Sequence, residues 1–253
     1  MESGEFMIRF VAAEDFARIS RIWQTCFGDP EDYVRFFFDH CLPLCRGLVY
    51  EIDGKPAAMA FLLPGALRLQ EESFPASYVY AVATLPAYRR RGAAAALMAH
   101  AASLARGEGQ AALCLRPGSE GLYGYYAKLG YVTGFARQDF TQAAREGIPQ
   151  KFQPAPAADF RDACWGRLGY FAWAPPLLGY MAKEHLFRGG EILLEESGYL
   201  LGIRDQDTGY RIRERCVCAP ADEPGGMVLP LNEAGRRWLA GSGGRGYLGL
   251  TLE

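Results

Sequence analysis

Three consecutive arginines followed by a glycine and small residues form the stretch of this chain best suited to chemistry. The segment is Arg89-Arg90-Arg91-Gly92, and Ala93 to Ala95 continue it. The first turn of a helix leaves backbone N–H groups unpaired at the positive end of its dipole, so a helix that begins here would attract phosphate. Gly92 and the small residues after it would let a pyrophosphate reach those N–H groups without meeting a side chain. The segment therefore predicts a pyrophosphate-binding turn.

The residues on either side predict a strand before this turn and a helix after it. Tyr78 to Thr84 is rich in aromatic and β-branched residues, and Pro86 stops the run because proline cannot donate to a ladder. Ala93 to Leu104 contains strong helix formers, with Gly107 as a C-terminal cap. The turn is thus expected at the start of a helix that follows a buried strand.

This combination resembles the acyl-CoA signature of the Gcn5-related N-acetyltransferases (GNAT). The residues that carry the resemblance are Arg89-x-x-Gly92-x-Ala94, preceded by a strand and by Pro86-Ala87-Tyr88. The resemblance implies that acetyl-CoA is the co-substrate and that its pyrophosphate lies on the turn. It also implies that the strand backbone pairs with the pantetheine arm and donates to the thioester carbonyl. The cofactor-binding residues expected on this basis are Val82, Ala83, Thr84, Arg89, Arg90, Arg91, Gly92, Ala93, Ala94 and Ala95.

A second segment resembles the family's downstream motif, in which a tyrosine precedes x-Lys-Leu-Gly-Phe/Tyr. Here that segment is Tyr126-Ala-Lys-Leu-Gly-Tyr131, on a helix expected through Gly121 to Lys128. The resemblance implies that Tyr126 lies near the thioester sulfur and is the general acid. Tyr123 and Tyr125 are more simply interpreted as packing residues. Ser119 is expected to contact the cofactor, and a helix N-cap explains it equally well.

The general base is left open by the sequence. The strand segment VYAVATLP contains no acid, although many members of the family use a glutamate on this strand or a chain of waters. The second half of the chain partly resembles the Eis-like tandem acetyltransferases, in which the terminal carboxylate reaches the active site. The carboxylate of Glu253 is therefore a candidate, and an ordinary surface terminus is the alternative.

Apolar periodicity and turn signals predict the remaining elements. The first half reads as a strand at 8–11, helices at 14–26 and from Asp29-Pro30 onward, hairpins at 47–63 and 66–85, and strands at 111–115 and 132–140. The expected fold class is α/β (α+β). The resemblance implies a GNAT-like mixed and mostly antiparallel sheet flanked by helices. Its C-terminal half is expected to be a second, degenerate GNAT-like unit.

A Pro- and Gln-rich stretch at 146–159 is the best linker candidate, which places a boundary near residue 150. The predicted domains are 7–145, which binds acetyl-CoA, and 155–253, a smaller α/β domain. The second domain is expected to contain helices at 160–168, 175–187 and 232–240, and strands at 191–195, 199–204, 210–218 and 247–252. Arg211, Arg213 and Arg215 alternate on one strand and are interpreted as a solvated edge face, with contact to an acidic substrate as the alternative.

Composition limits the classes of function. A net charge of −2 gives no reason to expect nucleic acid as a partner, and no apolar run approaches the length of a membrane span. The seven cysteines are scattered and only three histidines are present, so no metal site is expected. Mostly reduced thiols suit a cytoplasmic protein. The aromatic residues could support a homo-oligomer.

The sequence therefore predicts an acetyl-CoA-dependent N-acetyltransferase that modifies an amine of a small molecule or peptide. The alternative is a non-catalytic acyl-CoA-binding regulatory protein, which the missing strand carboxylate favours. A dinucleotide-dependent enzyme fits poorly because no Gly-x-Gly-x-x-Gly follows a first strand.

Overall fold

The computed structural model describes residues 6–138, 148–149, 152–195, 198–205, 209–215 and 220–250, with side chains omitted at a few strand ends. The N-terminal half supplies five neighbouring strands of one sheet. In the order in which they pair, they are β1 (Phe6–Phe10), β2 (Arg46–Ile52), β3 (Lys55–Leu69), β4 (Glu72–Thr84) and β5 (Ala112–Leu115). All neighbours are antiparallel except β4 and β5, which run parallel. Asp53 and Gly54 between β2 and β3 have φ of 51° and 69°, the positive values that a type I′ turn requires.

Four strands from farther along the chain continue this sheet. They are β12 (Pro220–Pro230), β6 (Val132–Gln138), β13 (Gly246–Tyr247) and β8 (Tyr170–Trp173). Strand β8 also pairs with Gly65 to Arg68 of β3, so the strands from β3 round to β8 form a closed circuit. The sheet therefore crosses the boundary expected near residue 150, and the division into two domains stays a prediction.

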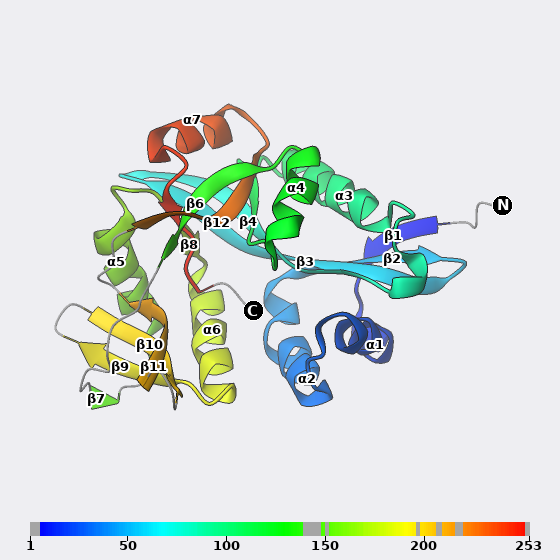
Figure 1. Ribbon diagram of the computed structural model, residues 1–253, viewed down its shortest axis with the longest axis horizontal. Helices are drawn as coiled ribbons and strands as arrows, with labels where there is room; N and C mark the ends of the chain where they lie inside the picture. The colour runs from blue at the N-terminus through cyan, green and yellow to red at the C-terminus, as the bar shows by residue number, and fades with distance from the viewer. Residues whose placement is uncertain are drawn as a thin grey trace.

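Helices cover both faces of the sheet, and the alternation of side chains along the strands explains how (Figure 1). On one face, Phe61 and Tyr80 pack with residues of α1 (Phe16–Phe27) and α2 (Glu31–His40). On the other, Leu62 and Val79 pack with α3 (Ala93–Gly107) and α4 (Glu120–Lys128). Neighbouring residues of a strand point to opposite faces, so β3 and β4 contribute to both cores. The expected mixed sheet flanked by helices is confirmed.

The C-terminal half adds a second, smaller sheet with order β11-β10-β9-β7. Its strands are β11 (Gly209–Arg215), β10 (Gly198–Asp205), β9 (Glu191–Glu195) and β7 (Ile148–Pro149). Helix α5 (Pro154–Trp165) lies between this sheet and the large one, and α6 (Pro175–Phe187) runs beside the small sheet on the side of α2 (Figure 1). The remaining elements are α7 (Glu233–Ser242) and the short 3-10 helices η1 (Ala13–Asp15), η2 (Leu42–Leu44) and η3 (Pro86–Tyr88).

Several expectations for the second half need correction. Residues 154–159, expected in a linker, form the first half of α5, which starts six residues before the predicted helix at 160. Strands β8 and β12 were not predicted at all. The closing strand β13 is confined to two residues, and Leu250 beyond it has φ of 57°.

A buried ion pair holds the C-terminal elements together. Arg161 on α5 and Glu214 on β11 form a salt bridge in which their side chains are 1% and 0% exposed. Glu214 also accepts hydrogen bonds from the hydroxyls of Tyr199 on β10 and Tyr247 on β13, the latter at 2.8 Å. One carboxylate therefore joins strands of the two sheets.

The cysteines differ in part from expectation. Cys26, Cys41, Cys45 and Cys114 carry free thiols. Cys164 is disulfide-bonded and is an exception to the expectation of mostly reduced thiols.

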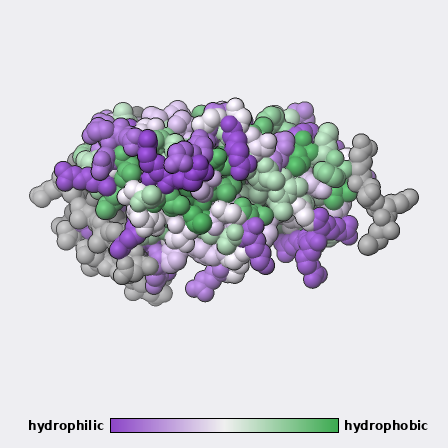
Figure 2. All heavy atoms as spheres, turned by 90° about the horizontal axis from the view of Figure 1, so that it is seen from above, coloured by the Kyte–Doolittle hydropathy of each residue, from purple (hydrophilic) through white to green (hydrophobic). Residues whose placement is uncertain are grey.

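The surface on the side of α3 and α7 is mixed in polarity. Hydrophilic atoms gather over the end that carries α7, where Glu233, Arg236 and Arg237 are exposed, and apolar atoms show between them and the far end (Figure 2). Across the described ranges, no helix is both long enough and apolar enough to span a membrane.

Candidate active site

Strands β4 and β5 separate within the segment Tyr78 to Thr84, where the sequence predicts that the cofactor binds. Strand β4 pairs with β3 as far as Thr84, but with β5 only through Ala76, Ser77 and Tyr78. Beyond Tyr78, no described strand pairs with the side of β4 that faces away from β3. The backbone N–H and C=O groups on this edge of β4 therefore have no strand partner. Because buried backbone groups need hydrogen-bond partners, an extended ligand can pair with them as an added strand would.

A bulge lies in this open part of β4. Met59 pairs with Ala83 and Phe61 pairs with Tyr80, so β4 has one extra residue between these pairs. Ala81 has φ of 50°, a left-handed conformation that is uncommon for a residue with a Cβ atom. A bulge of this kind re-aims the neighbouring backbone groups. Sequence reasoning missed it because nothing in Tyr-Ala-Val-Ala marks a bulge.

The predicted turn follows β4 directly and opens the long helix. Gly92 is the N-cap of α3 with φ of 86°, and no atom lies within 4 Å of the position a Cβ would take. The first helical hydrogen bond is donated by the N–H of Ala96 to the carbonyl of Gly92 at 2.9 Å. The N–H groups of Ala93, Ala94 and Ala95 therefore have no partner within the helix. The expected order of strand, turn and helix is confirmed, although α3 includes Gly107 and the left-handed glycine after it is Gly109.

The three arginines of the turn take different positions. Arg89 folds back on β4, where its Nε donates to the carbonyl of Thr84 at 3.0 Å. Arg90, with φ of 60°, and Arg91 are exposed, and the Arg91 guanidinium lies 5.9 Å from the centre of the Tyr88 ring. Arg89 thus fixes the turn to the end of the strand, and the other two extend the positive charge of the helix N-terminus.

Small or partly buried groups line the space between strand and turn. Ala83 and Ala93 are buried, whereas Val82, Ala94 and Ala95 are half-buried. The Thr84 hydroxyl is buried and has no hydrogen-bond partner among the described residues. A buried hydroxyl without a partner normally signals a ligand or water that completes its bonding.

Tyr126 lies on α4 in the same hydrophobic cluster as Val79 of β4. Its side chain is 7% exposed, and its ring centre lies 5.2 Å from that of Tyr125 and 5.7 Å from that of Tyr131. Burial, with a smaller contribution from Tyr125, raises the pKa of Tyr126 to about 12. The hydroxyl therefore keeps its proton at neutral pH.

The other residues predicted on this helix have distinct environments. The Tyr123 hydroxyl donates to the carbonyl of Pro224 at 3.1 Å, which attaches α4 to β12. Ser119 occupies the N-cap position, is exposed, and makes no capping hydrogen bond through its side chain. The N-cap position is thus confirmed, while the hydroxyl of Ser119 stays available to another partner.

On the opposite face of β4, a polar chain connects the two halves of the protein. The hydroxyls of Tyr80 on β4 and Tyr33 on α2 are 3.2 Å apart, and the Tyr33 hydroxyl donates to Glu184 on α6 at 3.4 Å. Burial, as the main cause, raises the pKa of both tyrosines. Sequence reasoning could not find this chain, because its members lie far apart and the two tyrosines resemble packing residues.

The expectation for the alternating arginines of β11 needs correction. The solvated-face interpretation of β11 is wrong for Arg213, which pairs with Glu184 at 2.6 Å, and for Arg215, which is 8% exposed. Only Arg211 of the three is exposed.

The catalytic base suggested from the sequence cannot be located, because Glu253 lies outside the described residues. Within those residues, no group of three or more His, Cys, Asp or Glu side chains converges in a way that could hold a metal ion.

Comparison with known proteins identifies the family of the first half. Residues 7–134, half of the chain, match the family model described as an acetyltransferase (GNAT) domain. A search of curated protein sequences finds no significant match.

Solved structures share the fold over nearly the whole chain. A probable N-acyltransferase from Enterococcus faecalis has a TM-score of 0.64 at 15% identity, over 96% of this chain and 64% of that one. A GCN5-related N-acetyltransferase from Kribbella flavida has a TM-score of 0.63 at 18% identity, with the same coverage. Eis1 from Mycobacterium abscessus has a TM-score of 0.60 at 18% identity, over 98% of this chain and 63% of its own. The chain thus spans slightly less than two thirds of these proteins.

Proposed function

We propose that this chain, which belongs to the GNAT acetyltransferase family, is an acetyl-CoA-dependent N-acetyltransferase acting on an amine of a small molecule or peptide. The observation that carries the proposal is that the unpaired, bulged part of β4 leads directly, through one turn, to the N-terminus of α3. Strand β4 thereby offers unpaired backbone for an extended arm, and the start of α3 next to it offers unpaired helix N–H groups for a pyrophosphate. A ligand that combines these two chemical groups is acyl-CoA.

The residues present fit such a ligand. The open space at Gly92 allows a phosphate to approach the N–H groups of Ala93, Ala94 and Ala95. Arg90 and Arg91 add charge at the rim, and Arg89 holds the turn against Thr84. The unpartnered Thr84 hydroxyl offers a further hydrogen bond at the end of β4. We therefore assign Val82, Ala83 and Thr84 to the pantetheine arm and the turn to the pyrophosphate, with Ser119 at the rim.

When bound, acetyl-CoA supplies an acetyl group activated as a thioester. The chain's part is to orient it through the strand backbone, to offer N–H donors where negative charge develops, and to supply a proton. We assign proton donation to the Tyr126 hydroxyl, which stays protonated across the physiological range because its pKa is about 12. Acetyl-CoA and the amine are the partners, and a cytoplasmic location and self-association remain parts of the proposal.

A non-catalytic acyl-CoA-binding regulatory protein is the second candidate. It is favoured by the absence of a carboxylate on β4 from Ser73 to Thr84 and by the raised pKa of Tyr126, which makes that hydroxyl a weaker acid. The two functions differ in turnover and not in binding.

A screen for thiol release separates them. Purified protein is incubated with acetyl-CoA and panels of small amines and peptides, and free CoA thiol is measured with a colorimetric reagent. The proposal expects amine-dependent release at a rate well above acetyl-CoA hydrolysis, with an acetylated product confirmed by mass spectrometry. Binding of acetyl-CoA without release across broad panels would instead support the regulatory role.

A further inference from the structure

The cofactor strand β4 is strained immediately after Tyr80. Ala81 has φ of 50°, and a residue with a Cβ atom keeps such a left-handed backbone only where the surrounding structure holds it. The bulge that contains Ala81 lies between the pair of Tyr80 with Phe61 and the pair of Ala83 with Met59. Tyr80 is thus the last regularly paired residue before the strained backbone.

Apolar packing holds the ring of Tyr80 on the face of the sheet that α1 and α2 cover. The ring centre lies 5.7 Å from that of Trp23 on α1 and 5.8 Å from that of Phe37 on α2. The Tyr80 side chain is 8% exposed, so the ring cannot turn away without opening this core. Packing does not fix the hydroxyl group, which needs a polar partner when it is buried.

The hydroxyl of Tyr80 begins a chain of hydrogen bonds that ends on a buried carboxylate. The oxygens of Tyr80 and Tyr33 are 3.2 Å apart, and the Tyr33 hydroxyl lies 3.4 Å from an oxygen of Glu184, whose side chain is 1% exposed. A carboxylate paired with arginines only accepts hydrogen bonds, so Tyr33 donates its single proton to Glu184 and accepts the proton of Tyr80. The chain therefore has one direction, from β4 through α2 to α6.

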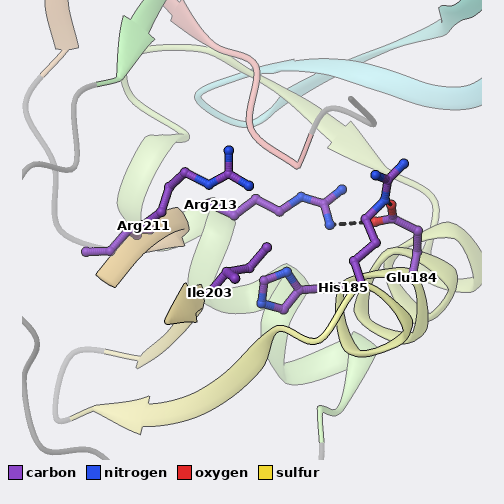
Figure 3. Close-up of a pocket in the computed structure, with 7 residues that line it drawn as sticks. Glu184, His185, Ile203, Arg211 and Arg213 are labelled. Carbon is purple, nitrogen blue, oxygen red and sulfur yellow. Dashed lines mark hydrogen bonds and ion pairs between the residues drawn. The ribbon is translucent and has the colours of Figure 1, made fainter. Parts of the chain in front are cut away.

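The C-terminal half of the protein fixes the far end of this chain. The carboxylate of Glu184 accepts hydrogen bonds from Arg213 on β11, at 2.6 Å, and from Arg188, which follows α6. Figure 3 shows the side chain of Arg213 extending from β11 to this carboxylate. Arg188 also pairs with Asp29, between α1 and α2, at 3.7 Å. One buried carboxylate thus connects the small sheet and α6, through Tyr33, to the cofactor strand.

We propose that Tyr33 is a positioning residue for acetyl transfer, which is anchored by Glu184 and acts through the hydroxyl of Tyr80 to hold the bulged backbone of β4. Because the role concerns acetyl transfer, it rests on the acetyltransferase function proposed above. Tyr33 does not touch the cofactor or the amine in this role. The C-terminal half takes part in the reaction through Glu184 and its partner Arg213.

The position of the bulge affects turnover more than cofactor affinity. The N–H groups of β4 stabilise the developing oxyanion only at hydrogen-bond distance, and a displacement of about 1 Å can lower a rate about 100-fold. The pyrophosphate is assigned to the separate turn at Gly92, which supplies helix N–H groups and positive charge. Loosening the bulge should therefore lower kcat and leave the affinity for acetyl-CoA nearly unchanged.

Steady-state kinetics of the full chain, with an amine identified by screening, compares Tyr33→Phe with Tyr199→Phe. Each substitution removes the hydroxyl of a buried tyrosine that donates to a buried carboxylate, Glu184 for Tyr33 and Glu214 for Tyr199 on β10. We expect Tyr33→Phe to lower kcat at least about tenfold, with acetyl-CoA affinity within about twofold of the wild type. Tyr199→Phe should keep kcat within about twofold although it lowers the melting temperature at least as much.

A double-mutant cycle tests whether Tyr33 acts through Tyr80. Tyr80→Phe removes the other end of the same hydrogen bond and should lower kcat by a similar factor. The double variant Tyr33→Phe/Tyr80→Phe should then be no slower than either single variant, because residues that act through one bond are not additive. Losses that multiply in the double variant would contradict the chain.

Relaxation-dispersion NMR of the backbone at Ala81 tests the chain without any substrate. We expect exchange on the microsecond-to-millisecond scale at Ala81 in Tyr33→Phe, as the strained backbone visits an ordinary conformation, and none in the wild type or Tyr199→Phe. Absence of this exchange in Tyr33→Phe would overturn the proposal.

The kinetic outcomes separate this role from the function on which it rests. If the wild type turns over, an unchanged kcat in Tyr33→Phe or an equal fall in Tyr199→Phe would overturn the positioning role and leave the acetyltransferase function intact. If the wild type binds acetyl-CoA but acetylates no amine, the acetyltransferase function fails, and the positioning role in acetyl transfer fails with it. The NMR result at Ala81 then still shows whether Tyr33 holds the bulge.

Discussion

Replacing Tyr126 with phenylalanine should slow acetyl transfer roughly 100-fold while leaving the fold and acetyl-CoA binding intact. The change removes one oxygen from a ring that is 7% exposed and packed between Tyr125 and Tyr131. No described residue accepts a hydrogen bond from this hydroxyl, so its loss should cost at most about 1 kcal/mol of stability. A fall in turnover would therefore report on proton donation and not on unfolding.

The size of the effect follows from the pKa of the hydroxyl. General acid catalysis contributes about 10²- to 10⁴-fold, and it is most efficient when the pKa of the acid lies near the operating pH. The Tyr126 pKa is about 12, whereas a free thiol has a pKa of about 8.5. Full transfer of the proton is thus unfavourable, and we expect the lower end of the range. The wild-type rate should also show no loss of this acid between pH 7 and about pH 10, because the hydroxyl stays protonated there.

The assay is thiol release from acetyl-CoA with an amine identified by screening, measured for the wild type, Tyr126→Phe and Tyr125→Phe. Tyr125 is the matched control because it is the neighbouring residue on α4 and carries the same hydroxyl. It should keep turnover within about twofold of the wild type. Unchanged turnover in Tyr126→Phe, or an equal loss in both variants, would refute the assignment of Tyr126 as the acid.

Two further predictions concern ion pairs that hold the fold. Glu214→Gln leaves the guanidinium of Arg161 buried without a counter-charge and should lower the free energy of unfolding, measured with denaturant, by about 3–5 kcal/mol. Glu223→Gln, at an exposed ion pair, should lower it by about 1 kcal/mol or less. Equal losses in the two variants would contradict the burial argument. Asp15, bonded to Arg9 at 2.6 Å, has a lowered pKa mainly because of that bond. Its contribution is present above the ordinary value of 3.8 and is lost as pH falls through the lowered pKa. Asp15→Asn should therefore destabilise the protein by about 2 kcal/mol at pH 7 and progressively less below pH 4, and a pH-independent difference would argue against the pair.

Local signals in the sequence were sufficient for the centre of the site. The aromatic strand before Pro86, the glycine at residue 92 and the alanine-rich helix are each specified within a few residues, so they could be predicted without tertiary information. The same holds for α6, which begins at Pro175 as expected. The bulge at Ala81, by contrast, arises from pairing with β3 and leaves no local signal in the sequence.

The C-terminal half was harder to predict because tertiary contacts override its local signals. Strand β12 contains Pro224, Gly225 and Gly226, which normally argue against a strand. A Cβ on Gly225 would lie 2.3 Å from the carbonyl oxygen of Ala136, so glycine is required for the close approach of β12 to β6. Pro154 resembled part of a linker, whereas it occupies the first position of α5, where proline is well tolerated.

The most direct test of the central claim is calorimetric titration of the protein with acetyl-CoA, beside the variants Gly92→Asp and Gly109→Asp. Both glycines have left-handed backbones, with φ of 86° and 71°, and both have open space where a Cβ would lie. The two variants therefore carry the same charge and similar backbone strain at opposite ends of α3. Our account predicts one-to-one binding by the wild type and Gly109→Asp, and binding at least about 30-fold weaker in Gly92→Asp, since its carboxylate repels the pyrophosphate. No binding by the wild type, or wild-type affinity in Gly92→Asp, would contradict the cofactor site and the acetyltransferase function built on it.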